Sequence, residues 1–222
     1  MIIPDPVLAV IFDLDGTLMD TACEIDLALA RTFTELRVPV LPTPDVVALI
    51  GRGVRSLVER ALQKQAADGI DIDAAVERFE HHYAGLVATQ AALYPGALEG
   101  MRLLAAHGRK LAVVTNKPRF FTERLLGNAG VDSMIDAVVA GDDGIRRKPA
   151  GDMLQAACAR MGAAPGETLM LGDSDNDIIA ARAAGCPVWC VPYGYNEGRP
   201  PEELKCDRLV ADIEEAARLL LA

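Results

Sequence analysis

The residues best suited to chemistry in this 222-residue chain are aspartates that follow short apolar runs. Asp13 and Asp15 come directly after the apolar residues 7–12, and Asp173 comes soon after the apolar residues 168–171. If both runs are central strands of a parallel sheet, the three carboxylates meet at the carboxyl edge of that sheet. Carboxylates this close repel one another and take up protons unless a cation lies among them. Oxygen ligands suit Mg²⁺, so we expect these aspartates to form a magnesium site.

Two further apolar runs end in groups that can bind a phosphoryl group. Thr115 and Asn116 stand at the end of the run 110–115, and Lys148 follows a polar loop after the run 137–140. A hydroxyl and an ammonium that face a metal ion across a carboxylate can position a phosphoryl group and stabilise its charge during transfer. A carboxylate at such a site can itself be the nucleophile and form an aspartyl-phosphate.

Each of these residues also has a purely structural interpretation. An aspartate after a strand is often a turn residue or a helix N-cap, and an acidic residue in a first helical turn, such as Asp177, stabilises the helix N-terminus. Lys148 could belong to a solvated basic cluster with the two arginines before it. A calcium loop over residues 173–184 is excluded, because its sixth and twelfth positions hold isoleucine and alanine instead of glycine and glutamate. Capping and turn formation do not explain why the whole set falls at strand ends.

The elements that must position these residues alternate between strands and helices. Short aliphatic runs indicate strands that are buried on both faces, namely residues 7–12, 110–115, 137–140, 168–171 and 188–191. Helical spacing, closed by a glycine each time, occupies residues 97–106, 120–129, 153–161 and 177–184. This alternation predicts the α/β class, with a doubly wound parallel sheet (a Rossmann-like core) and helices on both faces.

One long segment breaks the alternation, because it has helical periodicity and no strand pattern. Helices are expected there over residues 24–36, 54–66 and 74–87. The residues Leu93–Gly96 then form a turn that returns to the core. We therefore expect an α/β core formed by residues 1–18 and 92–222, with an inserted α-helical cap domain formed by residues 19–91.

The composition limits the classes of protein that are possible. There are 22 Lys and Arg against 32 Asp and Glu, and the net charge of −10 disfavours binding to nucleic acid or to an anionic membrane. No apolar stretch approaches the roughly 20 residues that span a bilayer, and the N-terminus lacks the pattern of a signal peptide. The five cysteines form no CxxC pair, so we expect reduced thiols and a cytoplasmic protein.

Taken together, four segments resemble the motifs of the haloacid dehalogenase-like phosphatase superfamily. In chain order they are DLDGT at Asp13–Thr17, the strand-end Thr115, the pair Lys148-Pro149 and GDSDND at Gly172–Asp177. The resemblance covers essentially the whole chain, with the helical insert in the place of the family's cap. It implies a Mg²⁺-dependent phosphomonoester hydrolase that acts through an aspartyl-phosphate on a small phosphorylated metabolite.

The resemblance assigns roles to the four acidic residues. It implies that Asp13 is the nucleophile and a metal ligand. Asp15 is implied to be the general acid and base, with its backbone carbonyl also touching the metal. Asp173 is implied to be a direct metal ligand, and Asp177 supports the metal shell through a water or from further away.

The remaining roles concern the phosphoryl group. The resemblance implies that Thr115 binds a phosphoryl oxygen with help from the Asn116 backbone, and that Lys148 pairs with the nucleophile and the phosphoryl charge. The carboxylate at Asp15 favours a phosphatase over the dehalogenase and phosphonatase branches, which lack it. It fits a leaving alkoxide that needs a proton.

Several other segments resemble the bacterial phosphoglycolate phosphatases. They are Thr115–Lys117, Tyr94–Gly96, Tyr193–Asn196 and the cap turn Gly51-Arg52-Gly53. In that turn the glycines Gly51 and Gly53 let a small ligand approach, and Arg52 could bind the carboxylate of a two-carbon acid. Alternatively, Arg52 is an ordinary surface residue at a helix start. The expected reaction is hydrolysis of 2-phosphoglycolate to glycolate and phosphate.

Other functions remain open at this point. One alternative is a phosphatase or pyrophosphatase of another small metabolite. A sugar-phosphate mutase is disfavoured, because Ile25 stands where the resembling mutases carry a histidine. A phospho-aspartate receiver module is disfavoured by the helical insert. The sequence is compatible with a monomer or a homodimer.

Overall fold

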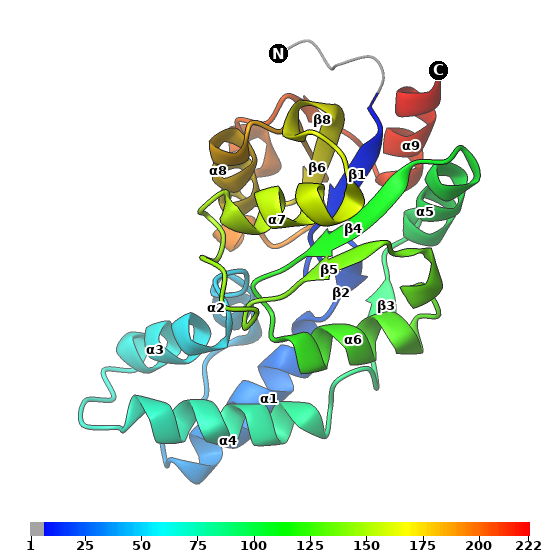
Figure 1. Cartoon of the computed structure of the whole chain (residues 1–222). Coiled ribbons are helices and arrows are strands. Elements are labelled where there is room, and N and C mark those ends of the chain that lie inside the picture. Colours follow the sequence, from blue (N-terminus) through cyan, green and yellow to red (C-terminus); the bar gives the residue numbers. More distant parts are fainter. Residues whose placement is uncertain (1–6) are drawn as a thin grey trace.

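Six parallel strands form the central sheet of the computed structural model, which describes residues 7–222 (Figure 1). In spatial order they are β5 (Ala137–Val139), β4 (Lys110–Val114), β1 (Ala9–Phe12), β6 (Thr168–Gly172), β7 (Val188–Cys190) and β8 (Arg208–Leu209). The chain starts in the middle of the sheet and winds outward in both directions, so the winding reverses between β1 and β6. The predicted α/β class with a doubly wound parallel sheet is confirmed. Residues 1–6, which begin the predicted core segment, lie outside the described residues.

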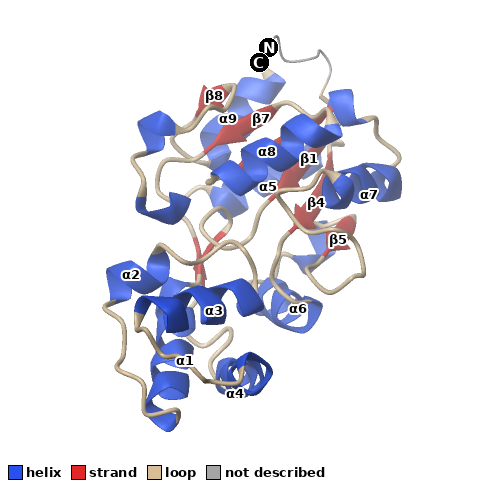
Figure 2. Cartoon of the chain, turned by 90° about the vertical axis from the view of Figure 1, so that its left-hand side faces the viewer, coloured by secondary structure: helices blue, strands red, loops and turns tan. Residues whose placement is uncertain are grey.

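Helices cover both faces of this sheet (Figure 2). On one face lie α5 (Ala97–Ala106), α6 (Arg119–Asn128) and α9 (Ile213–Leu221), and on the other lie α7 (Asp152–Met161) and α8 (Asp175–Ala184). In β1, Val10 and Phe12 pack on the first face, whereas Ala9 and Ile11 pack on the second. Each residue of β1 is therefore buried, as a strand between two helical layers must be.

The predicted strands and helices of the core agree with the structure to within two residues at each boundary. The structure adds β8 and α9, which the sequence analysis did not identify. The two residues of β8 are both exposed, so this edge strand has no apolar run that could have revealed it. By contrast, α9 begins at an Asp212 N-cap that accepts a hydrogen bond from the Glu215 N–H, which is a recognisable helix start.

Four helices occupy the segment between β2 (Met19–Asp20) and β3 (Ala92–Leu93). They are α1 (Ala22–Glu35), α2 (Thr43–Val47), α3 (Val54–Lys64) and α4 (Ile72–Ala84). The sequence analysis did not identify α2, and Pro44 lies in its first turn, where a proline fits without loss of a hydrogen bond. Antiparallel pairing of β2 with β3 places the two connections to the core side by side. The helices lie at the end of the core toward which the sheet strands run (Figure 1).

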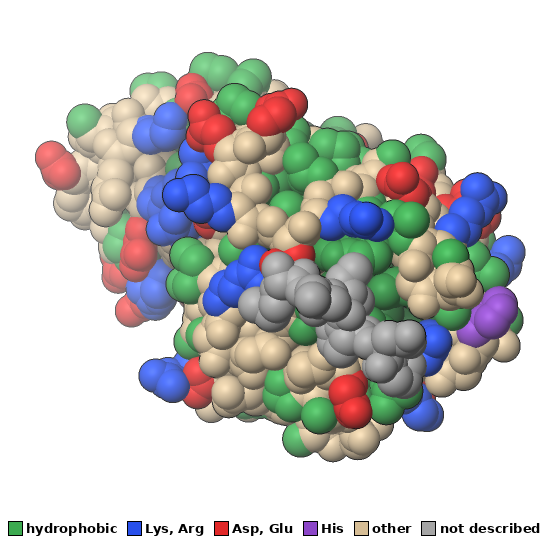
Figure 3. Space-filling model, turned by 90° about the horizontal axis from the view of Figure 1, so that it is seen from above, with side chains coloured by type: hydrophobic (Ala, Val, Ile, Leu, Met, Phe, Trp, Pro, Cys, Tyr) green, Lys and Arg blue, Asp and Glu red, His purple; other side chains and the backbone are tan. Residues whose placement is uncertain are grey.

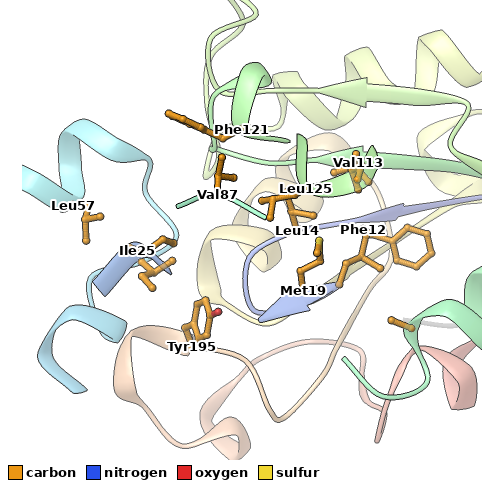
Figure 4. Close-up of a cluster of buried hydrophobic side chains, with 14 of the residues drawn as sticks. Phe12, Leu14, Met19, Ile25, Leu57, Val87, Val113, Phe121, Leu125 and Tyr195 are labelled. Carbon is orange, nitrogen blue, oxygen red and sulfur yellow. The ribbon is translucent and has the colours of Figure 1, made fainter. Parts of the chain in front are cut away.

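One apolar cluster extends from the sheet into these helices (Figure 4). It joins Phe12 and Leu14 of the core to Ile25 of α1 and Leu57 of α3. Between α4 and α6, the Tyr83 and Phe121 rings lie 4.7 Å apart, which is a favourable separation for aromatic side chains. Burial of apolar surface therefore stabilises the contact between the helical segment and the core.

The surface carries charges of both signs. At the end of the molecule that holds the termini, basic and acidic side chains are interspersed (Figure 3). None of the helices in residues 7–222 has both the length and the apolar character needed to cross a membrane. All five cysteines are free thiols.

Candidate active site

The reversal of winding between β1 and β6 brings distant aspartates together. Asp13 directly follows β1, and Asp173 directly follows β6. One carboxylate oxygen from each, and one from Asp177, all lie within 4.8 Å of one another, and the three residues are buried. Within residues 7–222 this is the one cluster of acidic, histidine or cysteine side chains close enough to share a metal ion.

A buried lysine completes this cluster. Lys148 lies in the loop after β5, and its Nζ is 2.9 Å from Asp13 Oδ1 and 2.7 Å from Asp177 Oδ1. Burial acts to lower the pKa of Lys148, but the attraction of the two carboxylates outweighs it and leaves the pKa above its ordinary value. The ammonium is therefore charged, and it is placed beside Asp13 where a phosphoryl group would need a counter-charge.

The charges of this cluster fit a divalent cation. Among the described residues of this cluster, three carboxylates face one ammonium, so two negative charges are without a counter-charge when all three carboxylates are ionised. Burial raises the pKa of Asp13 well above its ordinary value, although Lys148 opposes the shift. Burial and the charge of Asp177 raise the pKa of Asp173 to about 7. Buried carboxylates that resist ionisation and offer oxygen ligands suit Mg²⁺.

The side chain of Asp173 is held on both sides. The Thr17 hydroxyl donates to its Oδ1 at 2.7 Å, and the Tyr195 N–H donates to its Oδ2 at 2.8 Å. A Cβ on Gly16 would come within 2.6 Å of Asp173 Oδ2, and a Cβ on Gly194 within 2.2 Å of Asp173 Cβ. Two glycines are thus required for this carboxylate to lie where it does, and Gly16 also has a φ of +85° that favours glycine.

Asp177 serves the helix and the cluster at once. Its Oδ2 accepts hydrogen bonds from the N–H and the hydroxyl of Ser174, which close the first turn of α8. Its Oδ1 binds the ammonium of Lys148 at 2.7 Å. Asp177 therefore closes the first turn of α8 and also contacts Lys148 of the cluster, so its two interpretations do not exclude each other.

The carboxylate of Asp15 lies apart from the three clustered aspartates. Its Oδ1 accepts a hydrogen bond from the Thr21 hydroxyl at 2.6 Å, and both of its oxygens lie within 3.0 Å of the Nζ of Lys117. Burial acts to lower the pKa of Lys117, but the adjacent Asp15 carboxylate outweighs it, so the pKa lies above its ordinary value. Asp15, which is partly buried, and the buried Lys117 therefore form a second ion pair, separate from the first.

Thr115 and Asn116 join the two ion pairs. The Thr115 hydroxyl is buried beside the cluster and accepts a hydrogen bond from the Lys117 N–H at 3.2 Å. The Asn116 amide donates to the Lys148 carbonyl at 2.9 Å and accepts from the Lys148 N–H at 3.0 Å. It also donates to the Gly51 carbonyl at 2.9 Å. The Asn116 side chain therefore connects the cap turn to the backbone of Lys148.

A cavity lies between these residues and the helical segment. Its lining includes Asp13, Asp15, Thr115, Asn116 and Lys117 from the core, together with Ile25, Ile50, Gly51, Gly53, Val54, Leu57, Phe79 and Tyr83 from the segment between β2 and β3. The two glycines of the cap turn therefore border the cavity, as a close-approach role requires. A Cβ on Gly53 would come within 3.1 Å of the Asn116 carbonyl oxygen.

Arg52, the third residue of that turn, does not line this cavity. Its Nε lies 2.5 Å from Glu197 Oε1, and its side chain is 48% exposed. It borders a separate hollow, together with Lys148, Asn176 and Arg199 among others. The structure thus brings together every candidate residue of the core, and it places Arg52 outside the cavity that Asp13, Asp15 and Thr115 line.

The sequence analysis assigned no role to several residues of the site. Lys117 was noted only within a resembling segment, and Tyr83 and Glu197 were not singled out. Lys117 carried one usable signal, since a lysine two residues beyond a strand-end threonine falls at the same sheet edge as the aspartates. Tyr83 carried none, because it reaches the site from a distant segment. Glu197, which pairs with Arg52 outside the cavity, carried none either.

The fold and the site define a class of protein: a doubly wound α/β enzyme with carboxylates and lysines at the switch point, beneath an inserted helical segment. Residues 10–191 match the family described as haloacid dehalogenase-like hydrolase. That match covers most of the chain, and the chain belongs to this family.

Individual relatives agree with this assignment. The chain is 42% identical to a phosphoglycolate phosphatase of Nitrosospira multiformis over 220 residues, which cover 98% of this chain and 97% of that protein. The crystal structure of a predicted phosphoglycolate phosphatase from Haemophilus somnus is 30% identical, with a TM-score of 0.90 over 96% of this chain and 97% of that one. CbbY from Rhodobacter sphaeroides, solved with phosphate, is 26% identical, with a TM-score of 0.81 over 94% and 96% of the two chains.

The resemblance predicted from the motifs is therefore confirmed, both for the family and for the similarity to phosphoglycolate phosphatases. With such relatives over nearly its whole length, the chain is a phosphomonoester hydrolase.

Proposed function

We propose that this enzyme hydrolyses 2-phosphoglycolate to glycolate and phosphate, with Mg²⁺ as cofactor and through an aspartyl-phosphate on Asp13. The observation that carries the mechanism is the buried cluster in which Asp13 lies beside the Lys148 ammonium and within 4.8 Å of Asp173 and Asp177. The names of relatives at 30–42% identity support the substrate.

The division into two domains is part of the proposal. Residues 1–18 and 92–222 form the core, and residues 19–91 form a cap that closes over the cavity and excludes water. Two contacts across the boundary support closure, namely those of Asn116 with Gly51 and of the Arg124 guanidinium with the Ala84 carbonyl. The paired strands β2 and β3 are the connection about which such a cap would move.

In the first chemical step, an Asp13 oxygen attacks phosphorus and the bond from phosphorus to the ester oxygen breaks. Asp15 takes part in this step in its protonated form and donates that proton to the departing alkoxide, which leaves as the hydroxyl of glycolate. Thr115 and the Asn116 N–H bind phosphoryl oxygens, and Lys148 neutralises charge on the nucleophile and the phosphoryl group. The product is a phosphoryl group bound covalently to Asp13.

In the second step, water attacks the phosphorus of the aspartyl-phosphate. Asp15, now ionised, accepts a proton from the water, and the bond from phosphorus to the Asp13 oxygen breaks. Inorganic phosphate leaves and Asp13 is restored. One carboxylate is thus acid and then base, while the other is only a nucleophile.

The cofactor would be held at the clustered end of the site. Asp13, Asp173 and the Asp15 carbonyl are the proposed ligands, and Asp177 supports them from beside Lys148. When bound, Mg²⁺ supplies positive charge that stabilises the phosphoryl oxygens during transfer.

The proposal is tested by phosphate release from a panel of small phosphoesters and pyrophosphate, with Mg²⁺ and with a chelator. We expect 2-phosphoglycolate to have the highest kcat/KM and the chelator to abolish turnover. The Asp13→Asn variant should fold but release no phosphate. A higher kcat/KM for another ester would show that 2-phosphoglycolate is not the preferred substrate. Full activity of Asp13→Asn would show that Asp13 is not the nucleophile.

A further inference from the structure

The end of the cavity beneath the cap carries a cation that the proposed chemistry does not use. Among the described residues that line the cavity, Lys117 is the single one with a cationic side chain. That side chain is only 4% exposed, whereas Arg52 is 48% exposed and paired with Glu197 outside the cavity. A buried ammonium that borders a ligand cavity is suited to recognise an anion.

A second donor borders the same part of the cavity. The Tyr83 hydroxyl is buried and interacts with the Lys117 ammonium, and no other described residue is its hydrogen-bond partner. Its ring lies 4.9 Å from the Nζ of Lys117, so the two groups belong to one microenvironment. Because an ammonium only donates, the hydroxyl hydrogen of Tyr83 has no acceptor among the described residues. A buried donor without an acceptor is costly in a folded protein, and a ligand that accepts this hydrogen bond would remove that cost.

The position of Asp15 fixes which anion would reach these two groups. Asp15 is proposed to meet the ester oxygen of the substrate, and Lys117 lies within 3.0 Å of Asp15. In the phosphate ester of a 2-hydroxy acid, the carboxylate and the ester oxygen are attached to the same carbon. When the ester oxygen lies at Asp15, the carboxylate must therefore fall within one carbon of it, beside Lys117.

We propose that Lys117 and Tyr83 form the subsite that binds the substrate carboxylate and selects phosphate esters of 2-hydroxy acids. This inference rests on the proposed function and adds the residues that determine its specificity. Lys117 carries three donor hydrogens and faces both oxygens of Asp15, so we expect one of these contacts to pass to the substrate carboxylate while the other remains. Tyr83 donates its hydroxyl hydrogen to the same carboxylate.

The rest of the cavity reinforces this selectivity. Its cap wall is apolar and consists of Ile25, Ile50, Val54, Leu57 and Phe79. A carboxylate that is buried between these side chains loses its hydration, and this cost is offset only when an ammonium pairs with it. In such surroundings the attraction between the two charges is also stronger than in water.

The test compares two esters of similar size in purified enzyme with Mg²⁺. 2-Phosphoglycolate carries the carboxylate, and 2-hydroxyethyl phosphate carries a hydroxymethyl group in its place. In Tyr83→Phe we expect the ratio of their kcat/KM values to fall about 10-fold, and in Lys117→Met about 100-fold, as for hydrogen bonds to a charged group. The losses should lie mainly in KM for 2-phosphoglycolate.

Two further variants serve as controls. Lys117→Arg keeps the positive charge and should recover part of the ratio, whereas Arg52→Met should change both esters by the same factor. Because Lys117→Met leaves Asp15 without its ammonium partner, hydrolysis of both esters can slow in that variant. The test therefore uses only the ratio of the two kcat/KM values. Tyr83→Phe keeps the ring contacts with Phe79 and Phe121, so it tests the subsite even where Lys117→Met does not fold.

The outcomes separate this inference from the proposed function. The proposed subsite is wrong if the wild type has the same kcat/KM for both esters, or if each variant lowers the two kcat/KM values by the same factor. Either result leaves the proposed phosphatase activity intact. If the wild type releases phosphate from neither ester nor from p-nitrophenyl phosphate, the proposed function fails and the subsite with it.

Binding provides a second readout that needs no turnover. In the inactive Asp13→Asn background, calorimetry should show 2-phosphoglycolate binding at least about 10-fold more weakly when Tyr83→Phe is added. Equal affinity with and without the Tyr83 hydroxyl would contradict its role in the subsite.

Discussion

The two ends of the cavity balance their buried charges differently. At the ends of β1 and β6, three carboxylates face one ammonium, that of Lys148. Beneath the helical segment, one carboxylate faces one ammonium, in the pair of Asp15 with Lys117. The Tyr83 hydroxyl lies beside them, and its hydrogen has no acceptor among the described residues. The first end therefore has an excess of negative charge, whereas the second is balanced and has a donor to spare.

We infer from this difference that the two ends suit ligands of opposite charge. An excess of carboxylates favours a metal ion, since a divalent cation relieves their repulsion. A balanced ion pair with unused donors favours an anionic substrate group instead. The substrate we propose has a phosphoryl group for the first end and a carboxylate for the second.

Removal of Lys148 should have the largest effect, because its ammonium is the charge that faces both Asp13 and Asp177. In Lys148→Met we expect kcat to fall about 10³-fold, the usual loss when a charge-stabilising donor is removed from an active site. Lys110→Met is a matched control, since Lys110 forms an exposed ion pair with Asp136. Both variants are compared by phosphate release. Activity of Lys148→Met within a few-fold of the control would show that the ammonium is not needed.

Loss of the proton donor should come next. In Asp15→Asn we expect phosphate release to slow about 10²- to 10³-fold, because neither the leaving alkoxide nor the attacking water exchanges a proton with residue 15. If the second step is slowed more than the first, phosphoenzyme accumulates and intact-protein mass spectrometry detects one added phosphoryl group. Unchanged kinetics would contradict the acid–base role.

The metal should stabilise the folded enzyme more at high pH than at low pH. The pKa of Asp173 is about 7 in the folded protein and about 3.9 when unfolded, so without metal this group destabilises the fold as pH rises from about 4 to 7. Mg²⁺ binds the ionised form and competes with protons below pH 7. We expect saturating Mg²⁺ to raise Tm by about 5 °C at pH 8 and by clearly less at pH 5.5.

Scanning calorimetry at the two pH values measures this difference. Asp173→Asn, which carries no charge at either pH, should lose most of the Mg²⁺ effect and its pH dependence. An equal rise in Tm at both pH values would show that the cluster does not bind the metal.

The smallest effect is expected at the exposed ion pair between Arg52 and Glu197. A pair exposed to this degree contributes about 0–1 kcal/mol, so Glu197→Gln should raise KM by at most about 3-fold, equally for both esters. The effect should shrink further at high salt, because exposed charges are screened. A larger rise in KM for 2-phosphoglycolate alone would indicate that Arg52 of the cap turn takes part in binding the substrate carboxylate.

The sequence by itself determined the class of fold and the phosphoryl end of the site. Buried parallel strands are continuous apolar runs, and the turn that follows each strand is local in sequence, so the positions of Asp13, Thr115 and Asp173 could be predicted. The short strand β8 could not, because its two residues are exposed and owe their conformation to pairing with β7.

The tertiary structure alone decided how the other end of the site is built. Lys117 and Asp15 are 102 residues apart, and Arg52 and Glu197 are 145 residues apart. Tyr83 reaches the cavity because α4 packs beside α6, which no local pattern encodes. Local spacing specifies which residues end a strand, but the partner of a buried charge depends on which distant segments pack together.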